Sequence, residues 1–67
     1  MNTPIYPDIC VTLTGLDSNA MVLIAAVSRA MRRANLSKAE IYDFVREAGS
    51  GDYENVISTC AKYVTVN

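Results

Sequence analysis

The 67-residue chain has no histidine, no tryptophan and only two cysteines, and these absences remove most catalytic chemistry. Histidine is the commonest general base and the commonest metal ligand, so both roles lack their usual residue. A serine or cysteine nucleophile activated by histidine is excluded within one chain. Cys10 and Cys60 are 50 residues apart and form no Cys-x-x-Cys pair, which leaves a zinc site unsupported. We therefore expect no enzyme activity, no catalytic residues, no metal site and no cofactor.

Long hydrophobic runs and a strong net charge are also absent. The longest apolar run, residues 20–27, has eight residues, whereas a membrane-spanning helix needs about 20. The beginning, Met1-Asn2-Thr3-Pro4, is uncharged and interrupted by proline, so we predict neither a signal peptide nor membrane association. A formal net charge of −1 provides no overall attraction to nucleic acid or to anionic lipid. We expect a cytoplasmic protein whose two cysteines are free.

What the chain does contain is a series of helix-start and helix-stop signals. Alternating apolar residues predict strands over 9–14 and 63–66. Capping residues predict three helices between them, over 18–34, over 38–48 and from 53 onward. We predict an α+β fold in the order strand-helix-helix-helix-strand, with a small two-stranded sheet packed on three helices. Residues 1–8 are expected to form an extended N-terminal arm, and residues 9–67 a single domain.

The capping signals account for most of the conspicuous polar residues. Asp17 or Ser18 is expected to cap the first helix. Ser37 with Glu40 three residues later has the spacing of a capping box, and Gly49 or Gly51 is expected to end that helix in a left-handed conformation. Asp52 is then expected to cap the third helix.

The apolar positions of these elements predict the core. On the third helix, Tyr53, Val56, Ile57 and Cys60 are spaced as one stripe. Cys10 falls on the outward face of its strand. The expected core residues are Val11, Leu13, Leu23, Val27, Met31, Ile41, Phe44, Val45, Val56, Ile57 and Val64.

Two weak candidates for a ligand site have simpler interpretations. Asp43 and Glu47 lie one helical turn apart, but carboxylates on a solvated helix face are common and no calcium-loop spacing accompanies them. The segment 49–51 precedes a helix start as phosphate-binding loops do, yet it lacks their lysine, and Asp52 places a carboxylate there.

The first helix carries two features that capping does not explain. Its C-terminal end and the following turn hold Arg29, Arg32, Arg33 and Lys38, and no acid lies among them. They are candidate nucleic-acid contacts on a helix-turn-helix, unless the acidic helix that follows neutralises them. Its N-terminal half is apolar on all sides, with Met21, Val22 and Ala25 opposite the core stripe. That second face is either covered internally or a candidate protein interface, including one for self-association.

A set of short segments is distributed along the chain: Leu13-Thr14-Gly15, Asn19-Ala20, Arg32-Arg33-Ala34, Glu47 to Tyr53, Thr59 and Tyr63-Val64-Thr65-Val66. Taken together, they resemble a group of small uncharacterised proteins from bacterial, plasmid and phage genomes. The resemblance covers about residues 9–66, and Tyr63 stands where we would expect tryptophan. It implies a cytoplasmic accessory protein and carries no activity or site residues with it.

These observations leave the function unknown and favour one hypothesis over another. The leading hypothesis is a non-enzymatic protein-interaction module that binds an unidentified protein or a second copy of itself. The alternative is a small nucleic-acid-binding protein that uses the basic end of the first helix.

Overall fold

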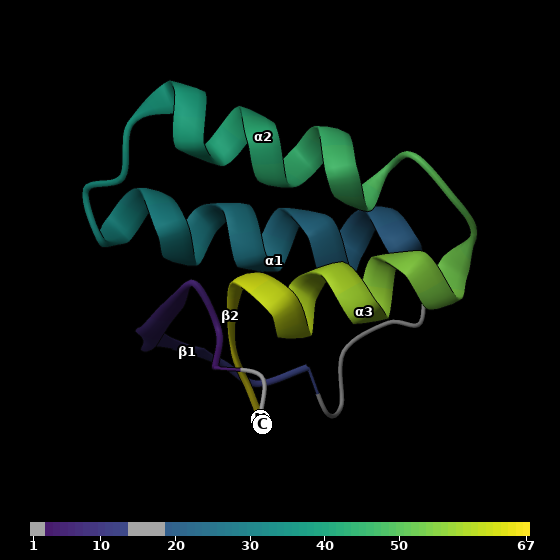
Figure 1. Cartoon of the computed structure of the whole chain (residues 1–67), viewed down its shortest axis with the longest axis horizontal. Coiled ribbons are helices and arrows are strands. Elements are labelled where there is room, and N and C mark those ends of the chain that lie inside the picture. The colour runs from purple at the N-terminus through teal and green to yellow at the C-terminus, as the bar shows by residue number, and fades with distance from the viewer. Residues whose placement is uncertain (1–2, 14–18) are drawn as a thin grey trace.

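A computed structural model of the chain describes residues 3–13 and 19–67. The elements follow in the order β1 (Tyr6–Val11), α1 (Ala20–Arg33), α2 (Lys38–Ala48), α3 (Tyr53–Tyr63) and β2 (Val64–Val66). The three helices lie alongside one another, and the two strands lie together below α1 and α3 (Figure 1). The predicted α+β order is confirmed.

The sheet joins the two ends of the described chain. β1 and β2 are parallel, with Tyr6 opposite Val64, Val11 opposite Val66 and an irregularity between Tyr6 and Cys10. The parallel direction requires a crossover connection, and the three helices carry the chain from the end of β1 back to the end of the sheet at which β1 began. Asn67 N donates to Val11 O over 2.9 Å and closes this pairing.

β1 begins three residues earlier than the predicted start at Ile9 and includes the end of the expected N-terminal arm. Pro7 lies inside it, which the sequence pattern disfavours. A strand with a neighbour on one side only tolerates proline, because an N–H that points away from that neighbour makes no ladder bond. Thr65 Oγ1 donates to Pro7 O over 2.8 Å and fixes this part of the strand. The predicted end at Thr14 lies outside the described residues.

The helix starts are set by side chains that accept backbone hydrogen bonds. Asn19 caps α1 by accepting from Met21 N over 2.8 Å, so the predicted start at Ser18 was wrong. The expected caps Asp17 and Ser18 lie outside the described residues. The capping box of α2 is confirmed, with Glu40 N to Ser37 Oγ at 3.1 Å and Ser37 N to Glu40 Oε1 at 2.8 Å. Asp52 caps α3 as predicted.

The left-handed end predicted for α2 was wrong. Gly49 is the C-cap, but its φ is −85°. The last carbonyls of α2 are satisfied from α3 instead, since Asn55 Nδ2 donates to Glu47 O over 2.9 Å and to Ala48 O over 3.3 Å. Left-handed backbone occurs instead at Asn35, which follows Ala34, the C-cap of α1, and has a φ of 66°. Asparagine is one of the few residues that tolerate that region.

The core lies between the helices and the sheet. Leu13 and Ile41 are partly buried and pack against the core. Val45 and Ile57 are exposed to 36% and 39%, so their prediction as core residues was wrong. The buried positions of α3 are 56, 59, 60 and 63, which rotates its inner face away from Tyr53 and Ile57. The buried apolar side chains are Val11, Leu23, Ile24, Val27, Met31, Phe44, Ala48, Val56, Cys60, Tyr63 and Val64.

Tyr63 belongs to α3 and not to the predicted C-terminal strand. Its ring packs edge-on against Phe44, with the centroids 5.3 Å apart, and joins α3 to α2 in the core. Within the part of the chain that the structure describes, no helix combines the length and apolar character needed to cross a bilayer.

Candidate functional site

The four basic residues singled out in the sequence come together at one end of the helical layer. Arg29, Arg32 and Arg33 occupy the last turns of α1, and Lys38 begins α2 after the short turn that joins the two helices. All four side chains are exposed. They represent four of the six basic residues in the chain.

The acidic residues of α2 do not neutralise this cluster. Glu40 is held in the capping box by Ser37 and also accepts from Tyr6 OH over 3.1 Å. Asp43 pairs with Arg46 at 3.6 Å, and Glu47 pairs with Lys62 at 2.6 Å. Among the described residues, the four cations of the cluster therefore have no carboxylate within ion-pair distance.

The Glu40 carboxyl is charged at neutral pH, and its hydrogen bonds hold it at the start of α2. Hydrogen bonds from the backbone and hydroxyl of Ser37, followed by the bond from Tyr6, lower the pKa of the Glu40 carboxyl below its usual value of 4.5. Desolvation and then the Glu40 carboxylate raise the pKa of Tyr6. Both groups are consequently held in one protonation state at neutral pH, which suits a structural role.

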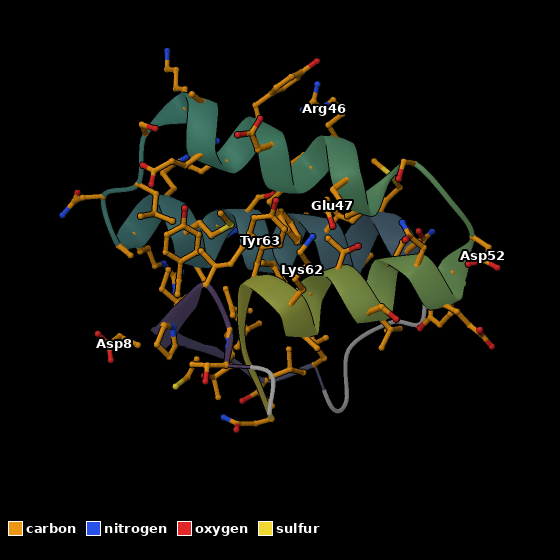
Figure 2. All side chains as sticks on the ribbon, in the orientation of Figure 1. Asp8, Arg46, Glu47, Asp52, Lys62 and Tyr63 are labelled. Atoms are coloured by element: carbon orange, nitrogen blue, oxygen red, sulfur yellow. The ribbon has the colours of Figure 1, made fainter. Side chains whose placement is uncertain are left out.

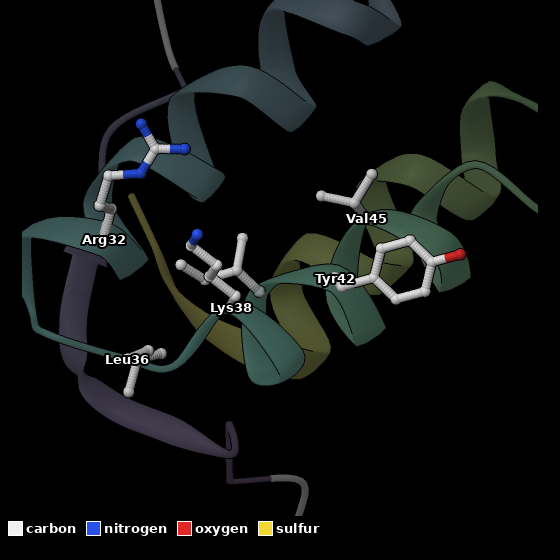
Figure 3. A pocket seen from close by; sticks show the side chains of 6 residues that line it. Arg32, Leu36, Lys38, Tyr42 and Val45 are labelled. Carbon is white, nitrogen blue, oxygen red and sulfur yellow. The ribbon is translucent and has the colours of Figure 1, made fainter.

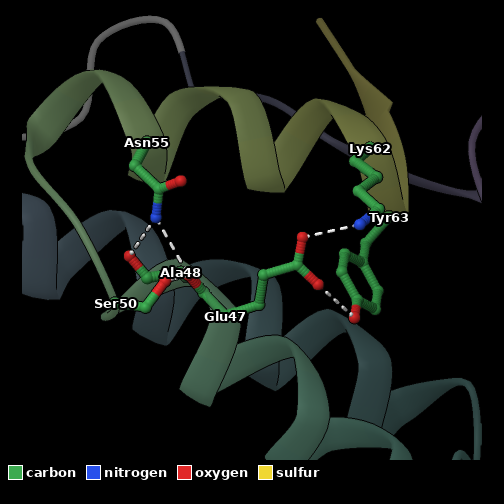
Figure 4. A network of polar contacts seen from close by, with 6 residues as sticks. All are labelled: Glu47, Ala48, Ser50, Asn55, Lys62 and Tyr63. Atoms are coloured by element: carbon green, nitrogen blue, oxygen red, sulfur yellow. Dashed lines mark hydrogen bonds and ion pairs between the residues drawn. The ribbon is translucent and has the colours of Figure 1, made fainter.

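The Glu47 side chain links α2 to α3 through polar contacts (Figure 4). Its carboxylate accepts from Lys62 Nζ over 2.6 Å and from Tyr63 OH over 3.0 Å, and these two bonds, in that order, lower its pKa. Figure 2 shows this group beside Tyr63 in the middle of the helical layer, whereas Asp52 lies at one tip of the molecule. Glu47 and Asp43 thus have different partners.

A groove opens beside the basic cluster, between the end of α1 and the outer side of α2 (Figure 3). It has a volume of about 510 Å³. Apolar groups supply most of its lining, with Arg32 and Lys38 as the charged members. We call it the cationic groove; it is lined by Arg32, Leu36, Lys38, Ile41, Tyr42 and Val45.

The most exposed aromatic ring of the described residues lines this groove. Tyr42 is 63% exposed, and the Arg46 guanidinium lies 5.9 Å from its ring centroid, within the range of a cation–π contact. Val45, one turn further along α2, keeps 36% of its surface exposed. The groove therefore offers an aromatic ring and an aliphatic side chain to a ligand, with guanidinium and ammonium groups around them.

The second apolar face predicted for α1 is exposed in the structure. Met21 is 70% exposed and Val22 37%, and Ala25 is exposed as well. By helical periodicity, positions 22, 25, 29 and 32 lie along one side of α1. Because Arg32 lines the cationic groove, this apolar stretch continues the groove side of α1 towards its N-terminus.

The remaining candidates for chemistry lead to no site. Cys60 is fully buried, and burial raises the pKa of its thiol, whereas Cys10 is exposed; both are free, as predicted. A search of the described residues finds no group of three or more Cys, Asp or Glu side chains placed to hold a metal ion.

The charged part of the groove was predicted from the sequence, whereas its apolar part was not. Ile41 and Val45 were assigned to the core, and Leu36 and Tyr42 were not assigned to a site. Tyr42 could have been recognised from its position on the helix. It lies off the apolar stripe that faces the core, so its aromatic side chain is expected at the surface.

No family model, curated protein or solved structure matches this chain. The chemistry of the cationic groove and of the adjoining α1 face is therefore the ground for a functional proposal.

Proposed function

We propose that the protein is a non-enzymatic interaction module that binds a protein partner in the cationic groove. The observation that carries this proposal is an exposed apolar lining next to four cations that have no carboxylate partner among residues 3–13 and 19–67. Apolar and aromatic groups in the middle with charged groups at the rim are typical of protein interfaces, where tyrosine and arginine are enriched.

The size of the chain supports the same proposal. A domain of 67 residues buries a smaller share of its surface than a larger domain, so its own folding leaves little free energy to spare. Three large apolar side chains remain exposed to water, so their burial does not contribute to the stability of this small domain: Met21, Tyr42 and Val45. A partner that covers these side chains would recover that burial.

The test is a comparison of matched variants in the cells that produce the protein. Tagged wild-type chain is expected to retain a protein that Tyr42→Ala and Val45→Ser fail to retain, because each change removes an apolar contact from the groove. Ile5→Ala is the control, since Ile5 is 52% exposed but does not line the groove. Equal capture by all four proteins would contradict the proposal.

A second candidate function, nucleic-acid binding, is favoured by one specific observation. Arg29, Arg32, Arg33 and Lys38 are exposed at one end of the molecule and free of carboxylate partners among the described residues. Four such cations suffice for a modest, salt-dependent affinity for phosphates. The apolar lining beside them has no role in that binding, which is why we rank this function second.

Its test is the salt dependence of binding to labelled duplex DNA and to RNA. If the cluster contacts phosphates, affinity falls steeply as salt rises, and Arg32→Ala with Arg33→Ala reduces the slope of log K against log salt by about 2. Arg46→Ala serves as a control outside the cluster. Absence of binding at low salt would remove this candidate.

We also propose that the protein acts in the cytoplasm and belongs with the small bacterial, plasmid and phage proteins that it resembles. Two free cysteines, one of them exposed, suit a reducing compartment. Fractionation of the producing cells tests the compartment, and recovery of the protein outside the cytoplasm would contradict it.

A further inference from the structure

The molecule carries a second exposed surface whose chemistry is the reverse of that of the cationic groove. At the start of α3, Tyr53 is 45% exposed and Ile57 39%. They are one helical turn apart and therefore share a side of α3. Asp52 and Glu54 flank Tyr53, are exposed and have no ion-pair partner among the described residues. One oxygen of Asp52 also accepts from Asn55 N as the cap of α3, so within the described structure Glu54 is the carboxylate without a structural role. We call this surface the acidic face of α3; it consists of Asp52, Tyr53, Glu54 and Ile57.

The two surfaces lie at opposite ends of the helical layer. The turn from α1 to α2, where the basic cluster lies, and the turn from α2 to α3, where Asp52 lies, are separated by the length of α2 (Figures 1 and 2). Eleven helical residues correspond to about 16 Å. In a single copy, the basic cluster and Asp52 therefore lie at different ends of the helical layer.

We propose that the partner in the cationic groove is a second copy of this chain, which inserts the acidic face of its α3. This inference rests on the proposed function, because it identifies the occupant of the same groove. Tyr53 and Ile57 of one copy would cover Tyr42 and Val45 of the other, in the manner of a helix bound in an apolar groove. Asp52 and Glu54 would come close to Arg32 and Lys38, and opposite charges at an interface also fix its register.

Charge complementarity selects this occupant over a nucleic acid or an arbitrary protein. Within the part of the chain that the structure describes, the cations of the groove have no carboxylate partner and the carboxylates of the acidic face have no cation partner. Each surface also has an exposed tyrosine and an exposed aliphatic side chain. The two surfaces thus match in both charge and apolar character.

The geometry predicts a head-to-tail assembly. Because two different surfaces meet, a pair still has one free groove and one free acidic face. Growth continues until a ring closes or a filament forms, so the assembly does not stop at a dimer unless one surface is blocked. This behaviour separates the proposal from a symmetric dimer built on one repeated surface.

The experiment is sedimentation of the chain and of two half-blocked variants. The groove variant combines Arg29→Glu with Arg32→Glu, and the α3 variant combines Glu54→Lys with Ile57→Ser. Wild-type protein is expected to grow beyond dimers as concentration rises and to dissociate as salt rises. Each variant alone is expected to stay monomeric, whereas a one-to-one mixture of the two is expected to form dimers and nothing larger, since each variant retains one working surface.

The mixture also controls for folding, because only folded variants can pair. Asp8→Lys is the control for Glu54→Lys, since it makes the same charge change at an exposed position on β1, and it is expected to assemble like wild type. A monomeric wild type at millimolar concentration, variants that assemble as wild type does, or a mixture that fails to pair would each overturn the proposal.

These outcomes are distinct from failure of the proposed function. A monomeric chain whose groove still captures another protein in a Tyr42-dependent manner overturns self-assembly and leaves the interaction module standing. Loss of both self-assembly and groove-dependent capture overturns both.

Discussion

Ser28 is a polar residue that the fold leaves unsatisfied. Its Oγ is buried and has no hydrogen-bond partner in the described structure. A buried polar atom without a partner costs about 1–3 kcal/mol, and alanine also has the higher helix propensity. We expect Ser28→Ala to raise the free energy of unfolding by about 1 kcal/mol, measured by urea denaturation.

The control for Ser28 is Ser58→Ala, an exposed serine in α3. Its substitution changes helix propensity without removing a buried hydroxyl, so a smaller gain is expected. If the two variants gain equally, the burial of the Ser28 hydroxyl contributes nothing.

The contact of Glu47 with Lys62 and Tyr63 makes the stability of the fold depend on pH. The pKa of Glu47 lies below the usual 4.5 in the folded state because Lys62 and Tyr63 donate to its carboxylate. The stabilisation is therefore complete above pH 4.5 and is lost as the pH falls through the lowered folded pKa. We expect Glu47→Gln to lower the urea midpoint at neutral pH and the deficit to shrink as the solution is acidified below that pKa.

Asp8→Asn is the matched control, because Asp8 is an exposed carboxyl on β1 without an ion pair in the described structure. A deficit for Glu47→Gln that persists unchanged into acid would show that the contact with Lys62 and Tyr63 does not depend on the charge of Glu47.

At the scale of elements, α2 depends on its capping box. Ser37 accepts from Glu40 N, and the Glu40 carboxylate accepts from Ser37 N. Replacing an N-cap serine by alanine costs about 1 kcal/mol. We expect Ser37→Ala to lower the free energy of unfolding by about that amount, as measured by thermal or urea denaturation. If Ser37→Ala, like the control Ser58→Ala, caused no loss of stability, this role would be contradicted.

Local signals predicted the elements well because caps act over three or four residues. Ser37 and Asp52 are found where the sequence placed them. The end of α2 was predicted at the right residue, but its left-handed cap was not found, because the last carbonyls bond to Asn55, seven and eight residues further along the chain in α3. The burial of Val45 and Ile57 was also mispredicted, since the rotation of a helix about its axis is set by what packs against it.

At the scale of the whole molecule, charge separation could be predicted in part. The sequence showed a basic segment followed by an acidic one, which left mutual neutralisation open. In the described structure, Asp43 pairs with Arg46 within α2, and Glu47 pairs with Lys62 of α3, which is a tertiary contact. The groove could not be foreseen, since it depends on how the end of α1 and the turn at Leu36 lie against α2.

The central claim is that the cationic groove is the surface on which a protein docks. The most direct measurement is photo-crosslinking in the producing cells, with benzoylphenylalanine in place of Tyr42 or, as control, in place of Ile5. We predict protein adducts at position 42 that disappear when Arg29→Glu and Arg32→Glu are added, and few adducts at position 5. Adducts of equal yield at both positions, or none at position 42, would contradict the claim.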